Sequence, residues 1–155
     1  MEALKKHKIT HISASNINTF ITNPAEWVIH YIYKLSFPSS AAAERGKYIE
    51  KALFHILGNG VSVDKAVEEQ SYFFAETCKE MKVPEEEYLK EKEFVQRAIK
   101  ALPKHLSKFG KIVGYQKKIG YNYKGIDILG YTDFDFELPD GSPLILDLKT
   151  TKKIN

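Results

Sequence analysis

Leu144-Ile145-Leu146-Asp147-Leu148-Lys149 is the stretch of sequence that decides the fold. It predicts an apolar strand that ends in two charged side chains. Because successive side chains of a strand alternate between its faces, Asp147 and Lys149 should project together, with Leu148 on the opposite side. Upstream, Gly130-Tyr131-Thr132-Asp133 lies in a second extended run and can bring another carboxylate beside Asp147. Two carboxylates and an ammonium on one sheet face favour a divalent cation with oxygen ligands.

The turn between these two runs predicts their register. Pro139-Asp140-Gly141-Ser142 is typical of a hairpin connection, so strands over 126–137 and 144–149 should be antiparallel. Asp133 lies six residues before Pro139, and Asp147 lies six residues after Gly141. The two carboxylates are therefore expected at similar heights along the hairpin. Two further strands are expected over 111–119 and 121–124, with a turn at Gly120.

Upstream of about residue 110 the patterns are helical. Ser13 or Ser15 can cap a first helix, and Asn23-Pro24-Ala25-Glu26 is typical of a second helix start. Three more helices are expected over 41–57, after Val61, and from Pro84 towards Gly110. The sequence thus predicts the α/β class as one domain over 1–155. A helical segment over 10–109 should pack on a small, mainly antiparallel or mixed sheet over 111–150.

Composition narrows the classes of protein that fit. The 155 residues are 43% hydrophobic with a net charge of +3, which permits a polyanionic partner without demanding one. No apolar run approaches the ~20 residues that span a bilayer, so no membrane partner is expected. The single cysteine, Cys78, excludes an internal disulfide and fits a reducing, cytoplasmic location. It also excludes an iron–sulfur cluster held by cysteines of this chain alone.

Three short segments, taken in order, resemble the PD-(D/E)XK nuclease superfamily. The resemblance is strongest to its RecB-like exonuclease branch, found in recombination and phage proteins. The segments are Ser13–Phe20 with Asn23–Trp27 and Tyr31; Arg45–Glu50; and Gly130–Asp133 with Asp140-Gly141 and Leu146–Thr151. The resemblance implies a restriction-endonuclease-like fold and a metal-dependent DNA nuclease, acting in recombination, repair or phage DNA processing.

The resemblance also implies a metal site. Glu50, Asp133 and Asp147 would supply carboxylates to Mg²⁺ or Mn²⁺, and the carbonyl of Leu148 would add an oxygen. Glu50 on a helix is equally compatible with an ordinary surface acid. Asp135 shares the strand face of Asp133, but the spacing from Gly130 favours Asp133 as the ligand.

Lys149 is the lysine of the family motif and, with the three carboxylates, completes the predicted catalytic set. A lysine among carboxylates holds its proton tightly, which favours a charged Lys149 that orients water and stabilises negative charge. A bound metal could offset the carboxylates, so a general-base role stays open. The residues expected to contact nucleic acid are Thr150, Thr151, Lys152 and Lys153.

Two departures from the family pattern define the alternatives. Many RecB-like proteins carry His where this chain has Glu50. The family fold also continues after the lysine strand with a helix and a further strand, whereas Thr150 to Asn155 are all that follow here. We therefore expect a fragment, a reduced member, or a fold completed by a second copy or a partner chain. The alternative function is a non-catalytic DNA-binding or assembly module, or half of a split nuclease.

Overall fold

The computed structural model describes residues 6–150 of the chain. By its internal contacts the chain divides into two compact units. The first unit comprises Met1–Phe37 and Gln116–Thr132, and the second comprises Pro38–Tyr115 and Asp133–Asn155. Each unit is described by itself below. The single domain expected from the sequence stays a prediction.

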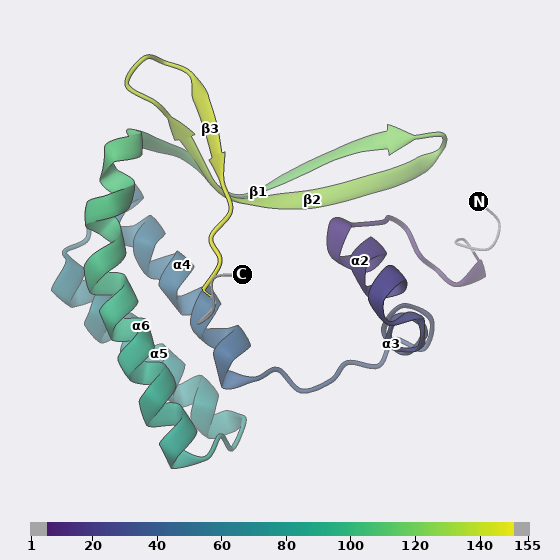
Figure 1. Cartoon of the computed structure of the whole chain (residues 1–155), viewed down its shortest axis with the longest axis horizontal. Helices are drawn as coiled ribbons and strands as arrows, with labels where there is room; N and C mark the ends of the chain where they lie inside the picture. The colour runs from purple at the N-terminus through teal and green to yellow at the C-terminus, as the bar shows by residue number, and fades with distance from the viewer. Residues whose placement is uncertain (1–5, 151–155) are drawn as a thin grey trace. The chain divides into compact units, whose positions relative to one another are not determined.

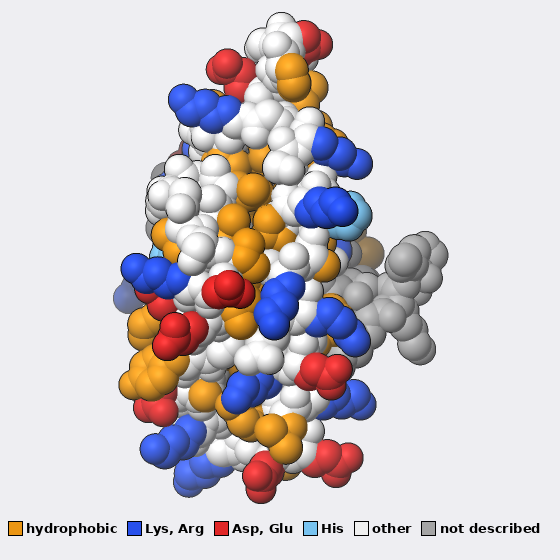
Figure 2. Space-filling view, turned by 90° about the vertical axis from the view of Figure 1, so that its left-hand side faces the viewer, with side chains coloured by type: hydrophobic (Ala, Val, Ile, Leu, Met, Phe, Trp, Pro, Cys, Tyr) orange, Lys and Arg blue, Asp and Glu red, His pale blue; other side chains and the backbone are white. Residues whose placement is uncertain are grey.

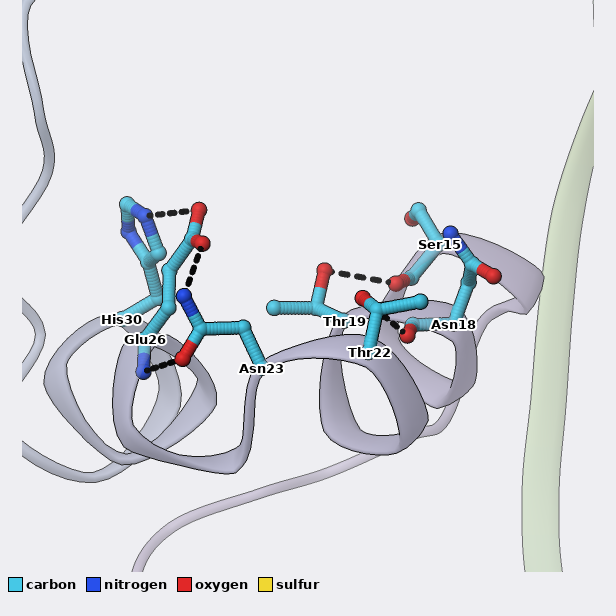
Figure 3. A network of polar contacts seen from close by, with 7 residues as sticks. All are labelled: Ser15, Asn18, Thr19, Thr22, Asn23, Glu26 and His30. Atoms are coloured by element: carbon cyan, nitrogen blue, oxygen red, sulfur yellow. Dashed lines mark hydrogen bonds and ion pairs between the residues drawn. The ribbon is translucent and has the colours of Figure 1, made fainter.

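In the first unit, two short helices begin where the sequence predicted. Helix α2 (Ala14–Thr22) is capped by Ser13, whose hydroxyl accepts a hydrogen bond from the backbone N–H of Asn16. Helix α3 (Pro24–Trp27) follows, and a π-helical turn over Val28–Ile32 extends it. Asn23 caps α3: its Oδ1 accepts from the Glu26 N–H at 3.2 Å and its Nδ2 donates to the Glu26 carboxylate at 3.0 Å (Figure 3).

The second unit contains three long helices that pack on one another (Figure 1). They are α4 (Ala41–Asn59), α5 (Val63–Glu80) and α6 (Glu85–Leu106). Ser40 and Ser62 cap the first two, and Gly60 ends α4 in the left-handed conformation with φ 70°. Three glutamates in the first turn of α6 complement the positive end of its dipole. The helical N-terminal half is confirmed.

A three-stranded sheet follows the helices in the order β1 (Lys111–Tyr123), β2 (Ile126–Glu137) and β3 (Pro143–Leu146). Strands β2 and β3 are antiparallel, with Phe134 opposite Leu146 and Phe136 opposite Leu144. These pairs face the helices and complete the core of the second unit. Its largest fully buried side chains are Phe74, Phe134, Phe136, Ile49, Leu53, Ile99, Gln70 and Val95.

Two sequence predictions about the strands are wrong. Gly120 does not form a turn, because β1 runs through it to Tyr123, and the turn lies at Lys124 and Gly125, which have φ of 49° and 81°. Gly120 instead leaves room for the side chain of Leu129 on β2, because a Cβ on Gly120 would lie 2.5 Å from Cδ2 of Leu129. The last strand also ends at Leu146 and does not reach Lys149.

The early end of β3 coincides with a contact from a side chain on β2. Beyond Leu146, the backbone N–H of Leu148 donates to the side chain of Asp133 at 2.7 Å. A side-chain carboxylate thus accepts a bond that a continuing ladder would give to a backbone carbonyl. The hairpin itself is confirmed, with the Leu138 N–H donating to the Ser142 carbonyl at 2.9 Å.

The face of the molecule drawn in Figure 2 carries charges of both signs. Basic and acidic side chains are interspersed there with hydrophobic ones. Within residues 6–150, no helix combines the length and the apolarity needed to cross a bilayer.

Candidate active site

Asp147, Leu148 and Lys149 lie immediately after the end of β3 in the second unit. The alternation predicted from the sequence persists there: Leu148 packs against the core, whereas Asp147 and Lys149 are exposed. The Lys149 ammonium lies 2.7 Å from the carboxylate of Asp147. With side chains 72% and 62% exposed, this ion pair contributes little to stability. It does fix where the ammonium lies in this structure.

Asp133 reaches the same segment from β2. It precedes Phe134, which pairs with Leu146, so Asp133 stands level with the residues that follow β3. Its half-buried carboxylate accepts the 2.7 Å hydrogen bond from the Leu148 N–H. Asp133 is therefore attached to the chain segment that carries Asp147 and Lys149, as the predicted hairpin register requires.

Glu50 enters the same neighbourhood from α4. The pKa of Lys149 is raised above its ordinary value by the hydrogen bond and charge of Asp147, with further contributions from Asp133 and Glu50. Burial acts against these effects but does not cancel them. All three predicted carboxylates thus act on one ammonium.

Tyr115, at the end of the β1 segment in this unit, is a neighbour that the sequence analysis missed. Its ring stacks on Phe54 at 4.5 Å between centroids and contacts Phe134 at 5.5 Å. Burial raises the pKa of its hydroxyl, and the charges of Glu50 and Asp133 raise it further. A tyrosine in a β-rich segment carries no motif, so the sequence held no signal for this position.

A groove of about 590 Å³ runs between α4 and the segment after β3. Its lining comes from Ala42, Ala43, Arg45, Gly46, Lys47, Glu50, Glu91, Leu148, Lys149 and Thr150. Glu91, on α6, is a second residue that the sequence analysis missed. Its position in an amphipathic helix resembles that of any surface acid, yet it is 4% exposed.

The other predicted residues are placed as follows. Thr150 is half-buried against α4, where a Cβ on Gly46 would lie 3.0 Å from its hydroxyl. Thr151, Lys152 and Lys153 lie outside the described residues. Asp135 is half-buried against β1, where a Cβ on Gly114 would lie 2.6 Å from its carboxylate. Asp135 therefore packs between β1 and β2 and is not placed beside Lys149.

The types of donor, though not their present spacing, suit a hard divalent cation. Three carboxylates and a backbone carbonyl are the oxygen ligands that Mg²⁺ and Mn²⁺ prefer. The three carboxylates lie near the Lys149 ammonium, which balances part of their negative charge in this structure. In the described part of the chain, no three acidic, histidine or cysteine side chains already stand close enough together to hold one ion.

Helices packed on a small antiparallel sheet, with carboxylates and a lysine where the last strand ends, define a restriction-endonuclease-like α/β protein. The chain belongs to the PD-(D/E)XK nuclease superfamily, whose family model matches residues 11–155. Neither a search of curated proteins nor one of solved structures finds a match. The family assignment and the geometry of the second unit therefore frame the function.

Proposed function

We propose that this chain is a metal-dependent DNA nuclease of the RecB-like exonuclease type, acting in recombination, repair or phage DNA processing. The observation that carries the proposal is the set of residues around Lys149. Its ammonium lies 2.7 Å from the Asp147 carboxylate, Asp133 accepts a hydrogen bond from the Leu148 N–H at 2.7 Å, and Glu50 lines the same groove as Lys149. Members of the matched superfamily are usually nucleases, and this is the chemistry that superfamily membership suggests. DNA is the substrate that follows from it.

Glu50, Asp133 and Asp147 would hold the ion, Mg²⁺ or Mn²⁺, with the carbonyl of Leu148 as a further oxygen donor. When bound, such an ion lowers the pKa of a coordinated water and neutralises charge on the scissile phosphate. The hydrogen bond from the Leu148 N–H holds the Asp133 carboxylate in place beside the segment that carries Asp147. Thr150, and Thr151, Lys152 and Lys153 beyond it, would contact the phosphates of the DNA.

Lys149 would act as a cation. Its raised pKa keeps the ammonium protonated throughout the neutral range, since the ordinary value is already 10.5. A protonated lysine donates hydrogen bonds to an attacking water and stabilises negative charge that develops on the phosphate. General-base chemistry would instead require a lowered pKa, and a bound cation that offsets the three carboxylates would act in that direction, so the base role stays open when the ion is bound.

A second candidate is a non-catalytic DNA-binding or assembly module, or half of a split nuclease completed by a second copy or a partner chain. The observation that favours it is the 2.7 Å contact between Lys149 and Asp147. The ammonium neutralises the very carboxylate that the ion would need. A module that binds DNA without cutting it could keep this ion pair permanently.

Cleavage of end-labelled linear DNA and of closed circular DNA, each with Mg²⁺ or Mn²⁺, tests the proposal. The wild type is compared with Asp147→Ala and Lys149→Ala. Glu137→Ala is the matched control, because Glu137 is an exposed acid on the same strand as Asp133. We expect metal-dependent loss of linear DNA alone, abolished in the first two variants and retained in the control.

Other outcomes separate the alternatives. Cutting of circles would make the enzyme an endonuclease. No cleavage by folded wild-type protein at any size in solution would overturn the enzymatic proposal and leave the binding module. Cleavage that appears only in an oligomer or with an added partner would support the split nuclease.

A further inference from the structure

Arg45 is a buried arginine that joins three parts of the second unit. From α4, its Nη1 donates to the carboxylate of Glu91 on α6, and both side chains are 6% exposed. Its Nη2 donates to the backbone carbonyl of Thr150 at 2.6 Å. The guanidinium also lies over the ring of Phe94, 4.4 Å from its centroid. One side chain therefore connects two helices to the segment after β3.

Gly46 allows the same close approach from the neighbouring position on α4. A Cβ there would lie 3.0 Å from the hydroxyl oxygen of Thr150, so a larger residue would require that hydroxyl to shift. The Arg45-Gly46 pair, which the sequence analysis singled out only as a motif, thus has a physical role. The arginine holds the backbone of Thr150, and the glycine leaves room for it.

The contacts of Arg45 bear on Lys149 through the geometry of the chain. The segment from Leu148 to Thr150 is held at both ends, by Asp133 at the Leu148 N–H and by Arg45 at the Thr150 carbonyl. Lys149 lies between the two attachments, and the Leu148 carbonyl lies between them as well. Fixing both ends restricts the backbone dihedrals that aim these two groups.

We propose that Arg45, oriented by Glu91, is a positioning residue that fixes the Leu148–Thr150 segment for the nuclease chemistry. The inference rests on the proposed function for its catalytic consequence. It assigns a role in catalysis to Arg45 and Glu91, which would touch neither the substrate nor the reacting atoms.

Energetics favour positioning over simple stabilisation. Burying an ion pair requires desolvating both charges, and replacing such a pair with apolar residues of similar size is often neutral or stabilising. If stability were the only role of these two positions, a well-packed apolar pair would serve as well as the ion pair. Only a planar guanidinium can bond the Glu91 carboxylate and the Thr150 carbonyl at once in fixed directions, because a lysine offers a single ammonium on a flexible stem.

Two variants separate the roles. Arg45→Lys keeps the charge opposite Glu91 but loses the fixed second donor. The double variant Arg45→Met with Glu91→Leu removes both buried charges and keeps apolar volume, so we expect it to fold. The readouts are unfolding in urea, the single-turnover cleavage rate, and amide hydrogen exchange at Leu148 and Lys149 in the full chain.

We expect both variants to unfold cooperatively, with faster hydrogen exchange at Leu148 and Lys149 and unchanged exchange in the middle of α5. Because a misplacement of about 1 Å can reduce a rate about 100-fold, we expect a loss of that order in single-turnover cleavage. Binding of uncleaved DNA in Ca²⁺ should change less than the rate does.

Each remaining outcome decides the inference. A double variant with wild-type exchange at Leu148 and wild-type cleavage would show that Arg45 serves stability alone. If the wild type does not cleave DNA, the proposed function fails, and hydrogen exchange still tests whether Arg45 fixes the segment. Unchanged exchange at Leu148 in both variants would overturn the inference whatever the activity.

Discussion

The backbone N–H of Leu148 donates a 2.7 Å hydrogen bond to the carboxylate of Asp133. The bond connects a residue of β2 to the segment that follows β3, where the sheet ladder has already ended. A predicted metal ligand therefore also serves as the structural partner of the segment that carries the other predicted ligand. Substitutions at Asp133 can separate these two roles.

Asp133→Asn should keep the fold and abolish metal-dependent cleavage, because the asparagine Oδ1 still accepts from the Leu148 N–H but carries no charge. We expect a loss of about 1 kcal/mol in the free energy of unfolding, since a bond to a neutral acceptor is weaker. Asp133→Ala leaves the N–H without this acceptor and should lose more than the asparagine variant does, up to about 3 kcal/mol. Urea unfolding beside a cleavage assay measures both, and equal stability losses in the two variants would contradict the structural role.

Lys149 should titrate above 10.5, because the Asp147 hydrogen bond raises its pKa, with help from Asp133 and Glu50. The folded chain binds this proton more tightly than the unfolded chain. The resulting stabilisation is present below the unfolded pKa and is lost as the pH rises through the folded pKa. NMR titration of the lysine Cε and Hε signals measures this pKa, and Asp147→Asn should lower it. A pKa lowered towards neutrality in the wild type with Mg²⁺ bound would instead favour the general-base role.

The sequence predicted the elements whose signals are local. Of the two serines that could cap the first helix, Ser13 does so, and Asn23 caps the second, each through a contact three residues away. The Pro139–Ser142 turn fixes the hairpin from its own residues. Such features need no knowledge of distant parts of the chain. They were sufficient to place Asp133 level with the segment of Asp147.

What the sequence did not predict depends on distant contacts. A glycine in the sequence is typical both of a turn and of a place where another part of the chain comes close. The Leu129 side chain, which lies against Gly120, shows that Gly120 belongs to the second kind. Beyond the end of β3 at Leu146, the N–H of Leu148 bonds the side chain of Asp133, which is fifteen residues away along the chain. Arg45 and Glu91 are separated by 46 positions, so nothing local marks them as a buried pair.

Gly110 should tolerate alanine far less well than Gly141, although both have positive φ, of 98° and 83°. A Cβ on Gly110 would lie 2.2 Å from the backbone carbonyl oxygen of Glu137, whereas one on Gly141 would meet nothing within 4 Å. Gly141→Ala should lose about 1–2 kcal/mol from backbone strain alone. Gly110→Ala adds overpacking and should lose about 3 kcal/mol or more in urea unfolding. Similar losses would contradict the close approach of β1 and β2 at this point.

Glu50 should report on two groups at once, because its charge raises the pKa of both Tyr115 and Lys149. Burial is the larger cause at Tyr115 and the Asp147 hydrogen bond is the larger cause at Lys149, so Glu50→Gln should lower both values without restoring either to its ordinary level. Glu44→Gln is the matched control on the same helix, since the Glu44 carboxylate pairs with Lys47 at 2.7 Å.

The measurement is a paired NMR titration of Tyr115 and Lys149 in the wild type and both variants, without and with Mg²⁺. A cation held by Glu50 lowers the pKa of each neighbouring group, because positive charge favours loss of a proton. Mg²⁺ should therefore lower both pKa values in the wild type and in Glu44→Gln, and much less in Glu50→Gln. An equal response to Mg²⁺ in all three proteins would remove Glu50 from the metal site and return it to the role of an ordinary helix acid.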